Sequence, residues 1–414
     1  MTEVSLFLAA LEKSEPVARQ AFLDEACAGQ PFMRERIEQL LAAYEAGHHM
    51  LEPPEHDPAA FDVAEDLARG HTQTADFTPA VLPGTVIAGR YRLTEQIGTG
   101  GMGTVWVAKQ TEPVVRKVAL KLIKPGMDSR AVLARIDAER QALALMDHPN
   151  IAKVLDGGLT SDGRPFFVME LVNGQPLTTY CDQNRLTTRA RLDLFVQVCH
   201  AVQHAHQKGI IHRDLKPSNI LVTLYDGMPV PKVIDFGVAK ATGGKLTDES
   251  LSTQFGVLVG TLEYMSPEQA AYSALDVDTR ADIYSLGVIL YELLAGLRPF
   301  DSKRFKQAAF DEVLRIIRDE EPSRPSDRLS SDGSLPSTAA LRQTEPKGLK
   351  ALLRGELDWV VMKCLEKQRD RRYETANGLA RDIQRYLADE PVEARPPSAR
   401  YRLSKVLRRH KGAV

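Results

Sequence analysis

The spacing of apolar side chains changes several times along this chain of 414 residues. Over residues 1–50 apolar residues recur every three to four positions, which predicts a helical N-terminal segment. Residues 51–84 lose that period and carry five prolines, so we expect a linker. From residue 91 short runs of β-type residues follow, and after about residue 177 the helical period returns. The pattern therefore predicts a small strand-rich lobe followed by a larger helical lobe.

Several interruptions of this pattern predict loops. Residues 211–221 and 235–267 carry polar motifs without a period, and residues 320–348 are rich in Ser, Pro, Arg and Asp, so we expect an exposed insertion there. The helical period ends near residue 388, and later prolines mark a second linker before a basic tail. The expected strands are 91–97, 104–109, 115–123, 154–159 and 165–170, with a helix over 129–146.

The composition is that of an ordinary globular protein, with 43% hydrophobic and 26% charged residues, which excludes a wholly disordered or collagen-like chain. The net charge of −2 argues against a dedicated nucleic-acid-binding protein. This value is the sum of an acidic segment and a basic segment at opposite ends of the chain. Residues 1–90 hold 15 acidic and 6 basic side chains, whereas residues 395–414 hold seven basic side chains and no acidic one. The four cysteines are scattered without a C-x-x-C pair, which predicts reduced thiols rather than a metal site.

The hydrophobic runs are too short to predict a membrane span. No stretch of 18 or more uncharged apolar residues occurs, and the best candidate, 283–297, is short and carries Glu292, which indicates a buried core helix. Glu3 stands where a signal peptide would have a basic region. We therefore expect a cytoplasmic protein.

A glycine-rich segment lies between the first two expected strands. Residues 98–105 read Gly-Thr-Gly-Gly-Met-Gly-Thr-Val, with Gly98, Gly100 and Gly103 in the G-x-G-x-x-G spacing. Glycines let a backbone approach phosphates closely. The same spacing serves dinucleotide-binding folds, in which a helix follows the glycines. Here β-type residues follow, so a β-hairpin is the better interpretation, with a plain glycine-rich turn as the alternative.

Two further segments carry charged residues in apolar surroundings. Lys121 ends the apolar run 118–121, and a lysine in such a strand is costly unless it is paired. A phosphate and the carboxylate of Glu139 are natural partners, and a lysine on the solvent face of the strand is the alternative. Asp235 follows an apolar run in the same way, which suits a strand end that delivers one carboxylate.

Residues 212–219, His-Arg-Asp-Leu-Lys-Pro-Ser-Asn, hold the most informative chemistry. Pro217 prevents a regular helix. Asp214 can accept a proton from a hydroxyl group, and Lys216 can neutralise charge on a transferring phosphoryl group. Asn219 offers an oxygen to a hard cation such as Mg²⁺, and Asp235 supplies a second ligand.

Together these motifs resemble the protein kinase superfamily, most closely the eukaryotic-like serine/threonine kinases of bacteria. The resemblance covers about residues 91–388 and implies an α+β, two-lobed protein kinase fold. We expect a kinase domain over 85–390, with an N-lobe over 85–172, a C-lobe over 173–390 and a basic, juxtamembrane-like tail over 391–414.

The resemblance also implies the role of each catalytic residue. Lys121 would bind the phosphates of ATP and pair with Glu139, and Asp214 would be the catalytic base with Lys216 beside it. Asn219 and Asp235 would hold Mg²⁺, with Mn²⁺ as an alternative. The glycine-rich loop would cover the phosphates, and the hinge and both lobes would enclose the adenine. The residues implied for adenine binding are Met169 as gatekeeper, the backbone of Glu170 and Val172, and the side chains of Val105, Ala119 and Leu221.

Regulatory and structural roles follow from the same resemblance. Arg213 would read a phosphorylated activation loop, with Ser252, Thr253 and Thr261 as the candidate regulatory residues. We expect phosphorylation in trans, which requires a homodimer at least transiently. The residues with implied structural roles are Glu268, paired with Arg372, and Asp282 in the central C-lobe helix.

Several alternatives and partners remain open at this stage. Besides protein substrates, the basic tail suggests an anionic membrane surface, and nucleic acid is not expected. A scaffold that binds nucleotide without turnover and a dinucleotide-dependent oxidoreductase are the rival functions. His200 and His204 have the i, i+4 spacing of zinc ligands, but no third ligand is evident, and the helix that leads to His212 explains them better.

Overall fold

The computed structural model describes residues 22–23, 26, 34, 81–100, 103–124, 143, 145–236, 262–271, 277–331 and 333–395. The chain divides into two compact units, Met1–Phe77 and Thr78–Val414. In the first unit the described residues are helical, and Leu23 is buried. The other predicted N-terminal helices, most of the predicted linker and nearly all of the helix predicted over 129–146 lie outside the described residues.

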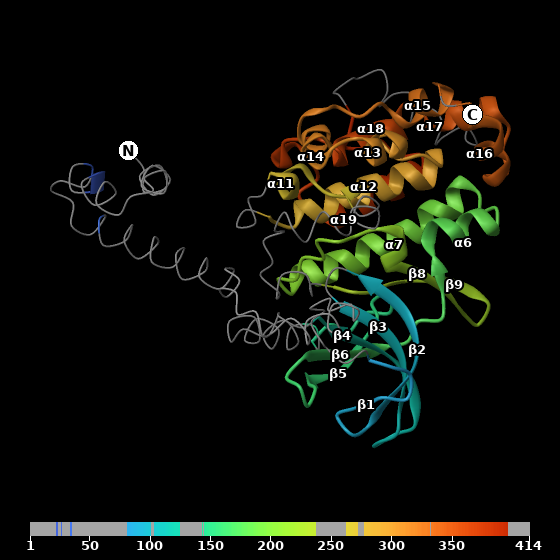
Figure 1. Cartoon of the computed structure of the whole chain (residues 1–414). Helices are drawn as coiled ribbons and strands as arrows, with labels where there is room; N and C mark the ends of the chain where they lie inside the picture. Colours follow the sequence, from blue (N-terminus) through green and yellow to red (C-terminus); the bar gives the residue numbers. More distant parts are fainter. Residues whose placement is uncertain are drawn as a thin grey trace, which may run out of the picture. The chain divides into compact units, whose positions relative to one another are not determined.

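The described part of the second unit begins with an antiparallel sheet of six strands, in the order β1-β2-β3-β4-β6-β5 (Figure 1). The strands are β1 (Val86–Ile87), β2 (Tyr91–Gly100), β3 (Gly103–Gln110), β4 (Arg116–Ile123), β5 (Val154–Leu159) and β6 (Pro165–Glu170). In β2 the buried Tyr91 and Leu93 alternate with exposed residues, as expected of a strand with one solvated face. From Val118 onward β4 is buried on both faces, which makes it the strand around which this lobe is organised.

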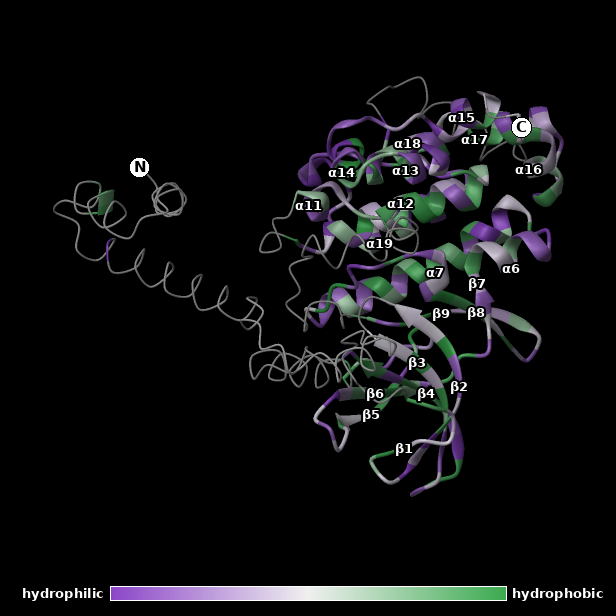
Figure 2. Ribbon diagram, in the orientation of Figure 1, coloured by the Kyte–Doolittle hydropathy of each residue, from purple (hydrophilic) through white to green (hydrophobic). Residues whose placement is uncertain are grey.

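The rest of the second unit is mainly helical. Its longest helices are α7 (Thr188–Gln207) and α12 (Arg280–Ala295). Almost every residue of α12 is buried, and Figure 2 shows apolar colours along most of it. The other helices are α6 (Leu177–Gln183), α11 (Pro267–Ala270), α13 (Ser302–Gln307), α14 (Phe310–Asp319), α15 (Pro325–Ser331), α16 (Leu335–Leu341), α17 (Pro346–Leu353), α18 (Glu356–Cys364) and α19 (Ala376–Leu387).

Close packing of α12 against α18 depends on one glycine. A Cβ atom built at Gly287 would lie 2.4 Å from the Cβ of Cys364, so a side chain at this position requires the two helices to move apart. The helix ends at Gly296, whose φ of +68° is readily adopted by glycine. The predicted core helix over 283–297 is therefore confirmed, and its length is set by a glycine end cap.

The predicted exposed insertion over 320–348 is wrong. These residues form α15, α16 and the start of α17, and Leu329 and Ala339 are fully buried in the helical core. Arg342 is also buried, and its guanidinium donates to the carbonyl oxygen of Leu293 at the end of α12. Helices of seven or eight residues complete only two turns, too few for an apolar period to be visible in the sequence.

A second correction concerns a small sheet inside the helical lobe. Its strands are β7 (Gln175–Pro176), β8 (Ile220–Tyr225) and β9 (Met228–Val233), where the pattern had predicted helix and loop apart from a strand end before Asp235. The turn between β8 and β9 is Asp226-Gly227, and both residues have positive φ. Aspartate followed by glycine is the usual sequence of such a hairpin turn, so the signal was present but was not used.

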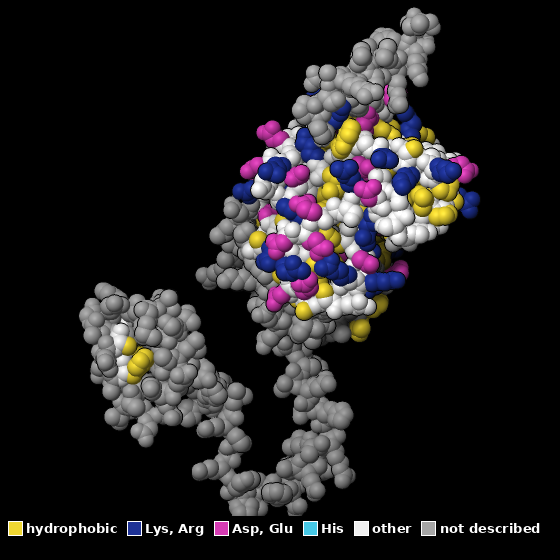
Figure 3. All heavy atoms as spheres, turned by 90° about the horizontal axis from the view of Figure 1, so that it is seen from above, with side chains coloured by type: hydrophobic (Ala, Val, Ile, Leu, Met, Phe, Trp, Pro, Cys, Tyr) yellow, Lys and Arg dark blue, Asp and Glu magenta, His cyan; other side chains and the backbone are white. Residues whose placement is uncertain are grey.

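The surface of the described region mixes charges of both signs. On the face shown in Figure 3, basic and acidic side chains alternate over the lobe without a large single-sign field. No helix in the described residues is long and apolar enough to cross a membrane.

Candidate active site

The site is built from β4 and from the segments that follow α7 and β9. Register places Lys121 between Val105 of β3 and Phe167 of β6, inside an otherwise apolar sheet. The Lys121 Nζ atom lies 3.2 Å from the Asp235 Oδ2 atom. Lysine and aspartate from the two lobes therefore meet, which satisfies the expectation that a lysine in this strand is paired. Glu139, the partner predicted from the sequence, lies outside the described residues.

The predicted catalytic octet forms one hydrogen-bonded group. Lys216 Nζ donates to Asp214 Oδ2 at 2.8 Å. The amide nitrogen of Asn219 donates to the backbone oxygen of Asp214 at 2.8 Å and to its carboxylate at 3.2 Å. Pro217 opens the short 3-10 turn η2 (Pro217–Asn219), and this turn brings Asn219 back toward Asp214. The sequence prediction that these three side chains act together is thus matched by their geometry.

Asp282 of α12 holds the backbone that carries this group. Its carboxylate accepts hydrogen bonds from the backbone nitrogens of His212 and Arg213, both at 2.8 Å. It also contacts His206 Nε2 at 2.7 Å. Burial alone would raise the pKa of Asp282, but the hydrogen bond and charge of His206, together with His212, hold it below the ordinary value. These bonds support a φ of +66° at Arg213, which a non-glycine residue rarely adopts.

The end of β9 delivers Asp235 and Phe236. Asp235 has a φ of +63°, and Phe236 is buried against the His212 ring with 4.7 Å between ring centroids. His212 Nε2 lies 2.9 Å from the carbonyl oxygen of Ile234. A small apolar cavity beside Asp235 is lined by Phe236 and by Met169. Met169, the predicted gatekeeper, thus lines the same cavity as Asp235.

Only some of the residues predicted to bind adenine lie in one apolar cluster. Buried Ala119 and Met169 form one apolar cluster, against which half-buried Val105 packs. Register explains the grouping, because Ala119 lies opposite Met169 across β4 and β6. Leu221 is half-buried on β8, opposite Pro176 of β7, and does not belong to this cluster. Val172 is half-buried just after β6.

Glu170, at the end of β6, is tied to both lobes. Its backbone nitrogen donates to the carbonyl oxygen of Lys153 at 2.8 Å. Its carboxylate accepts a hydrogen bond at 2.9 Å from the buried Lys232 of β9. Sequence reasoning missed Lys232, although it stands in an apolar run and the argument applied to Lys121 would have found it.

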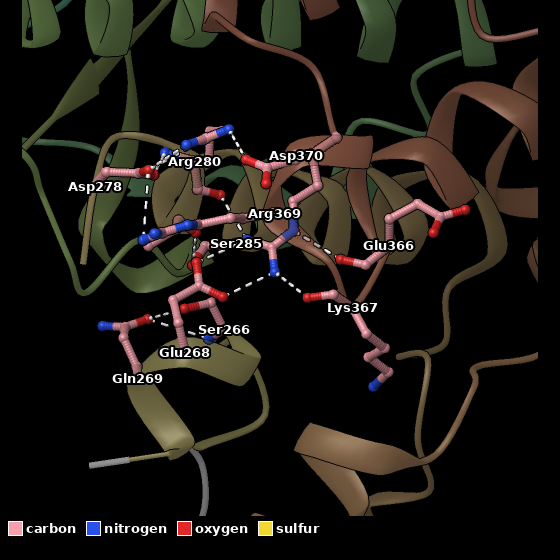
Figure 4. A network of polar contacts seen from close by, with 12 residues as sticks. Ser266, Glu268, Gln269, Asp278, Arg280, Ser285, Glu366, Lys367, Arg369 and Asp370 are labelled. Atoms are coloured by element: carbon pink, nitrogen blue, oxygen red, sulfur yellow. Dashed lines mark hydrogen bonds and ion pairs between the residues drawn. The ribbon is translucent and has the colours of Figure 1, made fainter. Parts of the chain in front are cut away.

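A polar network joins α11 to the start of α12 and to residues 366–372 (Figure 4). Glu268 and the buried Arg372 form a two-pronged ion pair at 2.7 and 2.8 Å, as predicted from the sequence. Arg372 also donates to three backbone carbonyl oxygens, so its donors are well satisfied. Gln269 donates to the backbone oxygen of Arg213 at 2.8 Å. Helix α11 is thereby linked to the residue next to Asp214.

Glycines shape the segment over the site. A Cβ atom at Gly103 would lie 2.1 Å from the carbonyl oxygen of Leu122, so the start of β3 can approach β4 only with glycine there. Gly98 and Gly100 belong to β2, and the hairpin predicted for this motif is confirmed by the pairing of Gly98 with Val105 and of Gly100 with Gly103. The tip residues, 101 and 102, lie outside the described residues, as do Ser252, Thr253 and Thr261.

The donor set fits a divalent cation held jointly with phosphates. Asp235 offers a carboxylate, and the Asn219 amide nitrogen is engaged by Asp214, which leaves the amide oxygen as its metal-binding atom. Within the described ranges, no group of three or more His, Cys, Asp or Glu side chains is arranged to hold a metal alone. Phosphate oxygens of a nucleotide would complete such a site, and oxygen ligands of this kind suit Mg²⁺.

Known proteins resemble this chain over the same region. The protein kinase domain model matches residues 91–383. Serine/threonine-protein kinase PknA of Mycobacterium tuberculosis is 40% identical over 250 residues, which cover 59% of this chain and 54% of that protein. PknB of the same organism is 34% identical over 314 residues, 74% of this chain and 44% of PknB. The chain thus spans about half the length of the curated relatives it matches.

One further curated relative and one solved structure also resemble this chain. Serine/threonine-protein kinase pkn3 of Myxococcus xanthus is 44% identical over 224 residues, which cover 53% of this chain and 40% of that protein. The crystal structure of the PknI kinase domain of M. tuberculosis superposes with a TM-score of 0.51 at 24% identity, over 74% of this chain and 99% of that domain. This structural likeness supports the two-lobed fold.

Proposed function

Because this chain belongs to the protein kinase family, with a domain match over residues 91–383, we propose that it transfers the γ-phosphoryl group of ATP to serine or threonine hydroxyls of proteins in bacterial signalling. The proposal rests on two sets of polar contacts. In the first, Asp214 is hydrogen-bonded to Lys216 and Asn219. The second is the ion pair of Lys121 with Asp235. Protein kinases use ATP and a divalent metal, and the second set has the charges to hold both.

In the proposed reaction, Asp214 accepts the proton of the substrate hydroxyl while it orients the oxygen. The side chain of Asp214 is about one-third exposed, so a protein substrate can reach it. Lys216 neutralises negative charge next to that carboxylate, and Lys121 binds phosphate oxygens. ATP is the phosphoryl donor, and Asp235 and Asn219 would hold Mg²⁺, with Mn²⁺ as an alternative, which would neutralise negative charge on the phosphates. Val105, Ala119 and Met169 provide apolar contacts for the base.

Substitution of Lys121 by methionine tests this assignment. We expect Lys121→Met to lower kcat/KM for ATP by about 100-fold, the typical loss when one preorganised charged group is removed. Lys117→Met is the matched control, because Lys117 is exposed on the same strand. Steady-state phosphorylation of a generic protein substrate measures both variants. Equal activity of Lys121→Met and Lys117→Met would reject the role of Lys121.

Regulation is proposed on the same basis. Arg213 lies beside the base, and Gln269 connects its backbone to α11. We propose that phosphorylation of Ser252, Thr253 or Thr261 in trans raises activity through charge pairing with Arg213. Phosphopeptide mapping of active enzyme would reveal this phosphorylation.

Two further points are proposals as well: the domain limits 85–390, and contact of the basic tail with an anionic membrane.

A further inference from the structure

A polar pocket lies on the helical lobe between the loop after residue 146, the second half of α7 and α19. Its volume is about 440 Å³. Three histidines line it, His148 from the loop and His200 and His204 from α7, together with Arg381 of α19. None of its lining residues belongs to the proposed active site. The two histidines that the sequence analysis set aside therefore meet a third one in the fold.

The lining favours an anion over a cation. Apart from the histidines and Arg381, all lining side chains are amides, Gln203 and Asn377 among them, and none is acidic. Amides and imidazoles can donate hydrogen bonds, and the arginine is always charged. That arginine would repel a metal ion, and in the described part of the chain no three metal-binding side chains are arranged for one.

One histidine of the pocket lacks a hydrogen-bond partner, and neighbouring histidines lower the pKa of another. The Nε2 atom of His204 is buried and has no hydrogen-bond partner. The rings of His148 and His204 lie with centroids 5.3 Å apart. Burial lowers the pKa of His148, and repulsion from His204 and His200 lowers it further. Asp147 is the nearby carboxylate, but Lys153 pairs with it at 2.8 Å.

We propose that this pocket binds a phosphoryl group, either as free phosphate or as a phosphorylated side chain, with Arg381 as the charged ligand and the three imidazoles as further donors. A dianion here would pair with the guanidinium and accept hydrogen bonds from the imidazole and amide N–H groups that line the pocket. Oxyanion recognition by an arginine and several neutral donors is a common arrangement for phosphate. The inference goes beyond the proposed kinase activity and does not depend on catalysis.

Histidine side-chain NMR of the full chain tests the proposal, with inorganic phosphate as the probe. We expect saturable shifts of His148, His200 and His204, with a dissociation constant on the order of 1 mM for so open a site. Arg381→Gln should weaken binding at least about tenfold through loss of a charge-assisted bond. Arg318→Gln, which removes an exposed arginine from α14, should leave it unchanged. Phosphate bound near Lys121 would move the resonance of His212 instead.

Phosphoserine is the second probe. Binding at least as tight as that of phosphate assigns the pocket to phosphorylated side chains, and binding of phosphate alone assigns it to the free anion. Absence of saturable shifts with every probe, equal weakening by Arg318→Gln, or shifts caused by Zn²⁺ but not by phosphate would each overturn the proposal.

Discussion

Two lysines show how single residues connect the lobes. Lys121 and Lys232 both stand in apolar strands and are almost completely buried, and each meets a carboxylate across the lobe junction. A buried ammonium group is costly without such a partner. The first pair joins β4 to Asp235, and the second joins β9 to Glu170 in the hinge. Two ion pairs therefore tie the strands of one lobe to the other.

Removal of Lys232 should affect nucleotide binding more than turnover. Lys232→Met releases the carboxylate of Glu170 and loosens the segment implied to bind adenine, so we expect KM for ATP to rise about three- to tenfold, corresponding to roughly 1 kcal/mol. The value of kcat should change less than twofold. Lys153→Met is the control, because its side chain is exposed and pairs only with exposed Asp147 among the described ion pairs. Initial-rate kinetics over a range of ATP concentrations decide the outcome, and an unchanged KM would contradict the assignment.

A second prediction at this scale concerns Asp282. Its pKa is depressed in the folded protein, so its charge stabilises the fold above the ordinary value of 3.8, and this contribution is lost as the pH falls through the lower folded value. Asp282→Asn should reduce the free energy of unfolding by about 2–3 kcal/mol at neutral pH, because two backbone donors and His206 lose a charged acceptor. Urea denaturation should show a constant difference from about pH 7 to about pH 5 and a difference that shrinks only as the pH falls below 3.8. A difference independent of pH would show that the charge of Asp282 is not what stabilises the loop.

At the scale of elements, α12 is the centre of the helical lobe because it is buried on every side. Its hydrophobicity was readable from the sequence, as were five of the six described strands of the first lobe, since long apolar runs and period-two alternation are local signals. The short helices α15 and α16 and the start of α17 were not predicted, and of the β7–β8–β9 sheet only a strand end before Asp235 was predicted. Their elements have two to eight residues, and burial by distant parts of the chain stabilises them, as Leu329 and Arg342 show.

Substitution of Gly287 tests the close packing of α12 against α18. Gly287→Ala places a Cβ atom 2.4 Å from the Cβ of Cys364, and we expect a loss of about 1–3 kcal/mol from overpacking. Gly378→Ala in α19 is the matched control, since its added Cβ meets ordinary contact distances and gains up to about 1 kcal/mol of helix propensity. Chemical denaturation of both variants should give opposite signs. Equal stability of the two would contradict the close packing of α12 and α18.

At the scale of the whole molecule, residues far apart in the sequence converge on the catalytic segment. Asp282 holds its backbone, Gln269 reaches the carbonyl oxygen of Arg213, and Asp235 meets Lys121. The residue types and their order were predictable, because each motif is local. The Lys121–Asp235 contact, the role of Lys232 and the three-histidine pocket were not, because they depend on how separate elements pack.

The central claim is phosphoryl transfer with Asp214 as the base, and one comparison tests it most directly. Transfer of labelled phosphate from ATP to a protein substrate should fall by a factor of about 100–10,000 in Asp214→Asn, the usual range for loss of a general base. Asp226→Asn is the control, because Asp226 lies in the exposed β8–β9 turn and asparagine also tolerates its positive φ. The account predicts full activity in Asp226→Asn. Activity of Asp214→Asn within twofold of the control would contradict it.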